Sequence, residues 1–188
     1  MGGVMSTIVV SGDTSGSITL AAPAVAGTNT ITMPAQTGNM MVNGPAFSVY
    51  LNANQSISSA TPTKVNFNTE LFDTANCFNS SSTYRFTPNI AGYYQFNWYV
   101  QTVNSTNTLI SYLVKNGDNN GPIGSAWRGS RVDVTGTTVS NGSSLVYLNG
   151  STDYVEVFGY IGSASAGFYG STLYSDACYF NGFLARGA

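Results

Sequence analysis

The segment from Tyr93 to Val103 constrains the fold most, because aromatic or aliphatic side chains alternate with polar ones along it. Tyr94, Phe96, Trp98 and Val100 are spaced by two, so they share one face of an extended strand. This alternation predicts a long β-strand with one buried face. After residue 46 no stretch has the 3.6-residue periodicity of an amphipathic helix.

Shorter runs rich in Val, Tyr, Phe and Thr predict further strands at 47–51, 63–67, 109–115, 144–148, 153–161 and 178–184. Turn-forming pairs separate these runs, and they include Asn116-Gly117, Asn141-Gly142 and Asn149-Gly150. Many short strands with such turns predict an all-β protein, either a sandwich or a barrel, and a jelly roll is one common form.

Aromatic residues divide the chain into two parts. All 12 Tyr, 10 Phe and 2 Trp follow residue 46. A segment without aromatics builds little core by itself. We therefore predict a short extended N-terminal β arm at 1–45 and a globular knob at 46–188.

Within the arm, Ser17–Leu20 and Thr30–Met33 share the pattern polar-Ile-Thr-apolar, and Thr7–Val10 is a third possible strand. Isolated strands expose backbone edges that need a partner. We expect the arm to pair with other subunits or a neighbouring protein, whereas a disordered leader is the alternative. The predicted anchoring side chains are Ile8, Val10, Ile18, Leu20, Ile31 and Met33.

Composition excludes several classes of function. Only 7% of residues are charged, the net charge is −2, and the 6 basic residues are scattered, which argues against nucleic-acid binding. No apolar run reaches the ~20 residues of a membrane helix. The N-terminus lacks the features of a signal peptide, so we expect synthesis in the cytosol. Cys77 and Cys178 are then expected to be free thiols, with a disulfide as the alternative.

Catalytic and metal chemistry have little support in the sequence. The chain has no His, which removes Ser-His and Cys-His catalysis and His-based zinc sites. Asp153 and Glu156 are three residues apart on a predicted strand and therefore face opposite sides; we interpret them as solvated strand ends. Asp118 lies in the cluster richest in oxygen ligands, which we interpret as an Asn/Gly hairpin turn. We predict a protein that is not an enzyme and needs no cofactor or metal.

One ordered motif resembles a known family. Arg85-Phe86-Thr87-Pro88 and the following Ala91–Trp98 resemble the signature of the C1q family of globular domains, which are relatives of tumour necrosis factor. Phe67, Asp73 and Phe78 fit its opening, and Phe86, Gly92, Tyr94 and Phe96 fit its close. Seven residues instead of six separate Phe78 from Phe86, which suggests a one-residue loop insertion. Trp98 replaces a Phe or Tyr. Flanking strands at 46–51 and 179–184 extend the resemblance over 46–186.

The C1q resemblance implies a jelly-roll β-sandwich of the C1q/TNF type that assembles as a homotrimer. It also suggests that Tyr94 and Phe183 line the threefold axis, although placement in the sandwich core is the competing interpretation. Residues 16–34 resemble a simple element that precedes knob domains in phage tail-fibre and other virion surface proteins. Together these features predict a structural protein on the outer surface of a bacteriophage, made in the host bacterial cytoplasm.

Two functions fit this expectation. A homotrimeric capsid decoration (cement) protein would bind the major capsid protein on the phage head through its N-terminal arms. A tail-fibre receptor-binding tip would instead attach to a baseplate or fibre protein and bind host surface glycans, with Trp127 and Tyr169 as loop contacts. If Met1 is the native start, there is no room for a fibre shaft, which favours decoration.

Overall fold

The computed structural model describes residues 7–11, 13–21, 24–25, 27–28, 43–103, 108–117, 126–133, 136–162 and 166–188. It divides into two units, Met1–Gly38 and Asn39–Ala188. All the regular elements among these residues are strands, and none of the described segments forms a helix that could cross a membrane.

The first unit contains one antiparallel hairpin, made by β1 (Thr7–Ser11) and β2 (Ser17–Ala21). Gly16, with a φ of 76°, supports the turn between the strands, since that left-handed backbone favours glycine. Ile8 pairs with Leu20 and Val10 pairs with Ile18. Directly opposed residues of an antiparallel pair point to the same side, so these four side chains share one face.

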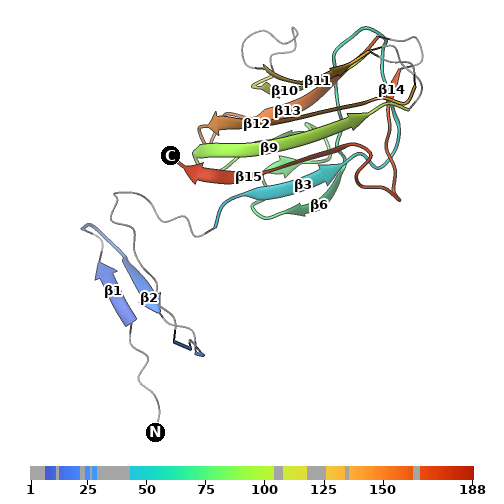
Figure 1. The fold of residues 1–188 in the computed structure, drawn as a ribbon. Coiled ribbons are helices and arrows are strands. Elements are labelled where there is room, and N and C mark those ends of the chain that lie inside the picture. The colour runs from blue at the N-terminus through green and yellow to red at the C-terminus, as the bar shows by residue number, and fades with distance from the viewer. Residues whose placement is uncertain are drawn as a thin grey trace. The chain divides into compact units, whose positions relative to one another are not determined.

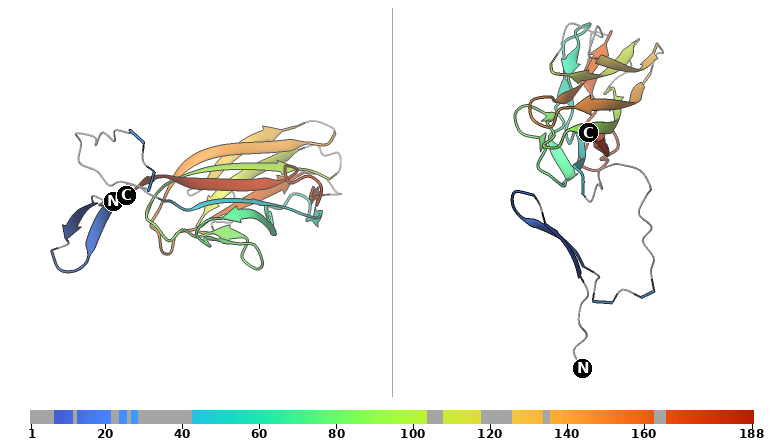
Figure 2. Two further views of the ribbon diagram at one scale, coloured as in Figure 1. Left: turned by 90° about the horizontal axis from the view of Figure 1, so that it is seen from below. Right: turned by 90° about the vertical axis from the view of Figure 1, so that its left-hand side faces the viewer.

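In the second unit, five antiparallel strands form the sheet that carries the C-terminus (Figure 1). Its spatial order is β12 (Val139–Leu148), β9 (Gly92–Gln101), β15 (Tyr179–Gly187), β3 (Ala46–Tyr50) and β6 (Thr69–Asp73). The first and last long strands of the unit, β3 and β15, are neighbours. Figure 2 shows β15 in red beside β3 in cyan.

A second, six-stranded sheet lies opposite the first (Figures 1 and 2). Its order is β11 (Ala126–Val132), β10 (Leu109–Lys115), β13 (Val155–Ile161), β8 (Arg85–Phe86) and β7 (Phe78–Asn79), with β5 (Thr63–Lys64) also paired to β13. A small two-stranded sheet joins β4 (Gln55–Ser56) to β14 (Gly167–Phe168).

Aromatic side chains from both sheets fill the space between them. Phe47 of the first sheet stacks on Phe86 of the second, with 4.5 Å between ring centroids. Phe180 meets Phe47 edge to face at 4.9 Å. These geometries are the ones that aromatic quadrupoles favour. The largest fully buried side chains are Trp98, Tyr94, Phe47, Phe67, Phe86, Phe96, Phe168 and Phe180.

A buried chain of polar groups crosses this core. The Trp98 indole N–H donates to the Ser111 hydroxyl at 2.8 Å, and the hydroxyls of Ser111 and Ser140 are 2.7 Å apart. Ser140 donates in turn to the backbone oxygen of Ser130. The network therefore ties β9 and β12 of one sheet to β10 and β11 of the other, and it gives the buried indole N–H an acceptor.

Most of the predicted long strands are confirmed, but one predicted turn is wrong. Asn141-Gly142 lies inside β12, where Gly142 passes beneath the Trp98 ring; a Cβ there would lie 2.1 Å from the ring. The turns at Asn116-Gly117 and Asn149-Gly150 do contain left-handed residues. Position 92 also requires glycine, since a Cβ there would lie 2.4 Å from the backbone oxygen of Arg186 on β15.

The interpretation of the carboxylates is corrected at Glu156. That side chain is buried on β13 and forms an ion pair with Lys64 of β5, so it is not a solvated strand end. Asp153 precedes β13 and pairs with Lys115 at 2.8 Å; its side chain is only 14% exposed, so it is not a solvated strand end either. The prediction of free thiols is confirmed, because Cys77 and Cys178 are both unpaired and buried.

Candidate trimer interface

The five-stranded sheet turns one face to the core, and the described residues of its own unit leave the other face uncovered. Burial alternates along β9 and β3, so the odd-numbered residues of β9 and the even-numbered residues of β3 point outward. The outward positions of β12 and β15 are odd-numbered as well, up to Phe183. We call these side chains of β12, β9, β15 and β3 the outward face.

An aromatic row crosses the distal end of the outward face, the end away from Ala46. Tyr99, Tyr179 and Tyr50 stand side by side on adjacent strands. The rings of Tyr99 and Tyr179 are parallel, with an interplanar angle of 1° and centroids 5.6 Å apart. Burial raises the pKa of the Tyr99 phenol above its usual range, so it remains a neutral hydrogen-bonding group.

A polar row follows the aromatic one. The Asn97 side-chain amide donates to the Asn181 amide oxygen at 3.1 Å, and the Ser143 hydroxyl donates to the Asn97 amide oxygen at 2.9 Å. Gln95 donates to the Ser143 hydroxyl at 2.7 Å. Because these groups already satisfy one another, covering them costs less than covering separate, water-bonded amides.

Large apolar side chains complete the outward face toward the end where β3 begins. Phe183 is 48% exposed and Leu145 is 54% exposed, on either side of Gln95. Tyr93 and Tyr147 meet edge to face at 5.5 Å and are also partly exposed. Large contiguous patches of exposed apolar groups are typical of surfaces that bind a partner.

Charge is almost absent from the strands of this face. Arg186 is the one charged residue in β3, β9, β12 and β15. Charged groups are depleted in the cores of protein interfaces, whereas Tyr and Phe are enriched there. The outward face therefore has the composition of an interface core.

The structure separates the two residues expected on the threefold axis. Phe183 is exposed on the outward face, so it stays a candidate for the axis. Tyr94 is fully buried in the sandwich core, and its hydroxyl donates to the Ile90 backbone oxygen at 2.7 Å. Because Tyr94 has no exposed surface, it cannot contact a neighbouring copy, and its expected place at the interface is wrong. The sequence did not lead us to predict Tyr93 and Leu145 as interface residues. Tyr93 nevertheless occupies an odd-numbered position of β9, on the side opposite the core residues.

Of the two expected receptor-contact residues, one lies in a strand and the other begins a loop. Trp127 belongs to β11 and packs against the main core. Tyr169 is partly buried and directly follows β14, where its backbone N–H donates to the Gln101 oxygen. The exposed large hydrophobic side chains of this loop, residues 169–178, are Leu173 and Tyr174, which are 83% and 60% exposed.

The expected arm residues are exposed where the structure describes them. Ile8, Val10, Ile18 and Leu20 all lie on the β1–β2 hairpin. Ile31 and Met33 lie outside the described residues, as do Asp118 and its neighbours Asn119 and Asn120.

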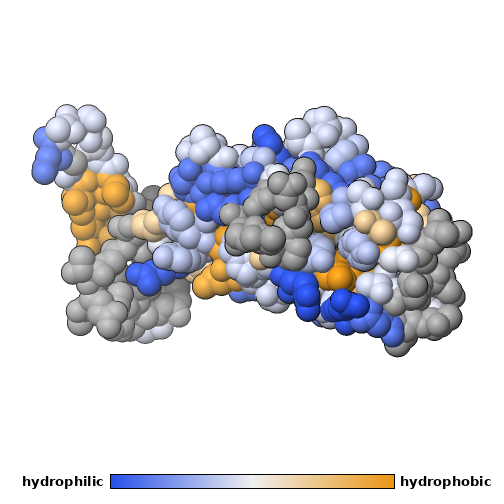
Figure 3. Space-filling view, turned by 90° about the horizontal axis from the view of Figure 1, so that it is seen from above, coloured by the Kyte–Doolittle hydropathy of each residue, from blue (hydrophilic) through white to orange (hydrophobic). Residues whose placement is uncertain are grey.

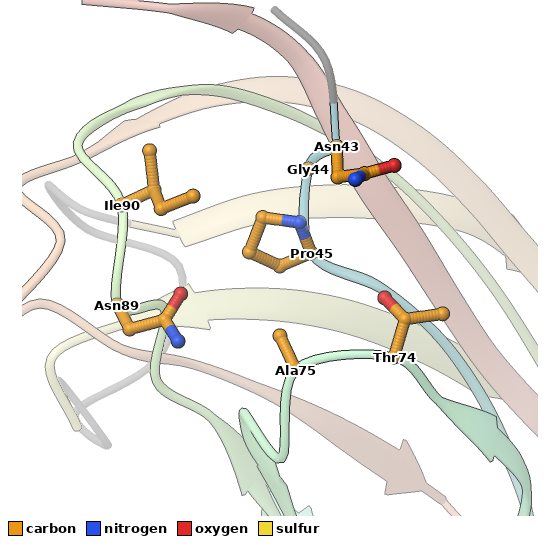
Figure 4. Close-up of a pocket in the computed structure, with 7 residues that line it drawn as sticks. All are labelled: Asn43, Gly44, Pro45, Thr74, Ala75, Asn89 and Ile90. Atoms are coloured by element: carbon orange, nitrogen blue, oxygen red, sulfur yellow. The ribbon is translucent and has the colours of Figure 1, made fainter. Parts of the chain in front are cut away.

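A pocket of about 420 Å³ opens beside the start of β3 (Figure 4). The lining residues are Asn43, Gly44, Pro45, Thr74, Ala75, Asn89 and Ile90. None of them is charged, and the hydroxyl of Thr74 donates a hydrogen bond to the Ala46 backbone oxygen at 3.2 Å. Among the described residues, moreover, no cluster of three or more His, Cys, Asp or Glu could hold a metal ion.

Comparison with known proteins places the second unit in a family. The profile of the C1q domain matches residues 46–185. The chain belongs to the C1q domain family. This C1q domain accommodates the extra residue of its signature in the turn between β7 and β8, whose strands pair Phe78 with Phe86. Asp73, a motif position, accepts hydrogen bonds from the backbone N–H groups of Ala75 and Phe78 and so caps the turn after β6.

Solved structures of TNF-like proteins share the fold. A crystal structure of murine APRIL at pH 8.5 matches with a TM-score of 0.53 and 11% identity, over 76% of this chain and 99% of that chain. Eiger TNF from S. frugiperda matches with a TM-score of 0.54 and 10% identity, over 77% and 94%. These likenesses confirm the predicted jelly-roll sandwich. No curated protein matches the sequence significantly.

Proposed function

We propose that this C1q domain forms a homotrimer through its outward face. C1q and TNF domains typically form homotrimers, and the family is generally non-enzymatic. The observation that carries the proposal is the face itself, where a tyrosine row, a self-satisfied amide row and exposed Phe183 and Leu145 occur with almost no charge. Its partner is then a second copy of the same domain.

The trimer, in this proposal, is a structural virion protein that decorates the outer surface of a phage head after synthesis in the host cytoplasm. The resemblance of residues 16–34 to virion-protein arms supports this role. The β1–β2 hairpin supports it as well, because its strands have unpaired edges that can add to a neighbouring sheet. The major capsid protein is the proposed partner of the arms.

The location on the particle tests the decoration role. Density for this chain in a reconstruction of the intact virion should repeat with the capsid lattice, so that its copy number scales with that of the major capsid protein. A few trimers per particle, all at the tail, would refute the role. Purified protein should also rebind heads from which it has been stripped.

A second candidate function, a receptor-binding tip, is favoured by the loop at the distal end of the sandwich. Ser171 holds this loop in shape, since its hydroxyl accepts hydrogen bonds from the backbone N–H groups of Leu173 and Tyr174. The loop therefore presents two apolar side chains in a preformed conformation. Tyrosine rings stack on apolar sugar faces and lose little conformational entropy on binding.

Competition for adsorption tests the receptor-binding candidate. Purified trimer should block phage adsorption to host cells, and a Leu173→Ser/Tyr174→Ser variant should lose most of that activity. Ile90→Ser, which changes an exposed residue elsewhere on the domain, is the matched control and should still compete. Absence of competition at saturating wild-type protein would eliminate this candidate.

A further inference from the structure

The β1–β2 hairpin carries an apolar face that the described residues of its own unit leave exposed. Ile8, Val10, Ile18 and Leu20 share one side of the hairpin and are 65%, 57%, 70% and 47% exposed. Figure 3 shows the apolar atoms of the hairpin gathered in one orange patch. An isolated two-stranded hairpin is only marginally stable in water. This face therefore needs a partner if the hairpin is to persist.

The chemistry of the hairpin suits another copy of itself. Neither β1 nor β2 contains a charged residue, so identical copies do not repel one another. The face is aliphatic throughout, and it offers no charge or amide to recognise a polar surface. Identical aliphatic faces are complementary to one another because dispersion and hydrophobic contacts do not depend on direction.

The proposed trimer would bring three such faces within reach of one another. Residues 22–45 join the hairpin to β3, and roughly two dozen residues span at most about 80 Å when fully extended. Tethered copies meet at effective concentrations in the millimolar range, far above those of free chains. Three equivalent faces can also close around the symmetry axis without leaving one unpaired.

We propose that the three β1–β2 hairpins of one trimer pack their apolar faces together into a single stalk. This inference rests on the proposed homotrimer. The stalk buries Ile8, Val10, Ile18 and Leu20 between copies and keeps the opposite face, with Val9 and Thr19, outermost. The arms then leave the trimer as one rigid unit and not as three separate strands, and the surface available to a virion partner is the outer face of the stalk.

Disulfide trapping in the full chain tests the stalk. Ile18→Cys puts a thiol on the apolar face, and Thr19→Cys is the matched control on the adjacent, opposite-facing position. The native thiols do not interfere, because Cys77 and Cys178 are buried. With oxidised glutathione as oxidant, Ile18→Cys should form disulfide-linked dimers at least tenfold faster than Thr19→Cys. The rate should stay constant over a hundredfold dilution, since the reaction is within one trimer.

The outcomes separate the stalk from the trimer itself. Sedimentation of both variants is measured first. A monomeric chain overturns the trimer, and the stalk with it. A trimer in which the two cysteines cross-link at equal rates, or not at all, overturns the stalk alone. If Ile18→Cys stays uncross-linked and becomes protected from alkylation only when capsids are added, the apolar face binds the capsid instead, and the stalk is again refuted.

Discussion

Replacing Ser111 by alanine should expose the energetic importance of the polar network that crosses the core. In the wild type, Ser111 accepts from the Trp98 indole N–H and shares a hydrogen bond with Ser140. The alanine side chain removes both. Ser140 still donates to the Ser130 oxygen and still accepts from the Ser111 backbone N–H, so it keeps partners. The Trp98 N–H loses the one acceptor that the structure gives it.

The expected cost follows from that single unsatisfied donor. Trp98 is 1% exposed and Ser111 is fully buried, so water does not replace the lost hydroxyl. A buried donor without an acceptor costs about 1–3 kcal/mol of stability. Trp98→Phe removes the donor and so relieves this cost in the Ser111→Ala background. The two substitutions should therefore be non-additive, with a coupling energy of about 1 kcal/mol or more.

Urea unfolding followed by far-UV circular dichroism measures the four proteins of this cycle. Protein concentration is held fixed, because an oligomer gains apparent stability with concentration. Ser58→Ala, which removes an exposed hydroxyl, is the control and should change stability by less than about 0.5 kcal/mol. A Ser111→Ala effect as small as that of the control, or strictly additive effects of the two core substitutions, would refute the account of the network.

Three further predictions concern the outward face, an ion pair and the thiols. Phe183→Glu should convert trimers to monomers by light scattering, because each interface would bury a charge without a partner, whereas Leu173→Glu at the distal loop should stay trimeric. Burial acts to raise the pKa of Asp153, but hydrogen bonds from Asn116, Lys115 and the Asn149 backbone N–H together hold it below its usual value. Asp153 therefore contributes fully to the free energy of unfolding above its unfolded pKa of about 3.9, and this contribution is lost as the pH falls through its pKa in the folded protein. The stability difference between wild type and Asp153→Asn should accordingly shrink at low pH. Burial raises the pKa of Cys178 to about 12 and that of Cys77 above its usual value, so neither thiol should react with an alkylating reagent at neutral pH until the chain is unfolded; labelling of the folded protein would contradict this.

Strands with a regular pattern could be predicted from the sequence, and strands without one could not. β9 alternates strictly because one side packs in the core, and this period is visible in the residues. β11 contains Gly129 between two arginines and shows no alternation, so its pairing with β10 depends on tertiary contacts. The first half of β12 could not be predicted because Asn141-Gly142 is typical of a turn. In the structure Gly142 lies within the strand, where the absence of a side chain leaves room for the Trp98 ring.

The candidate interface was only partly predictable for a related reason. Parity along β9 places Tyr94 on the buried face with Phe96 and Trp98, but the family resemblance suggested the threefold axis for it. Tyr94 was assigned to the threefold axis, yet it packs inside, whereas its neighbour Tyr93 is outside. The amide row is also invisible in the sequence, because Asn97 and Asn181 are brought together only by the pairing of β9 with β15.

Sedimentation equilibrium of the purified chain tests the central claim, that the outward face joins three copies. The account predicts one species at three times the 19.7 kDa mass of the chain, with no dissociation on dilution to micromolar concentration. The same experiment on Phe183→Glu should move the mass toward that of a single chain. A wild-type protein that sediments at 19.7 kDa across the concentration range would contradict the account.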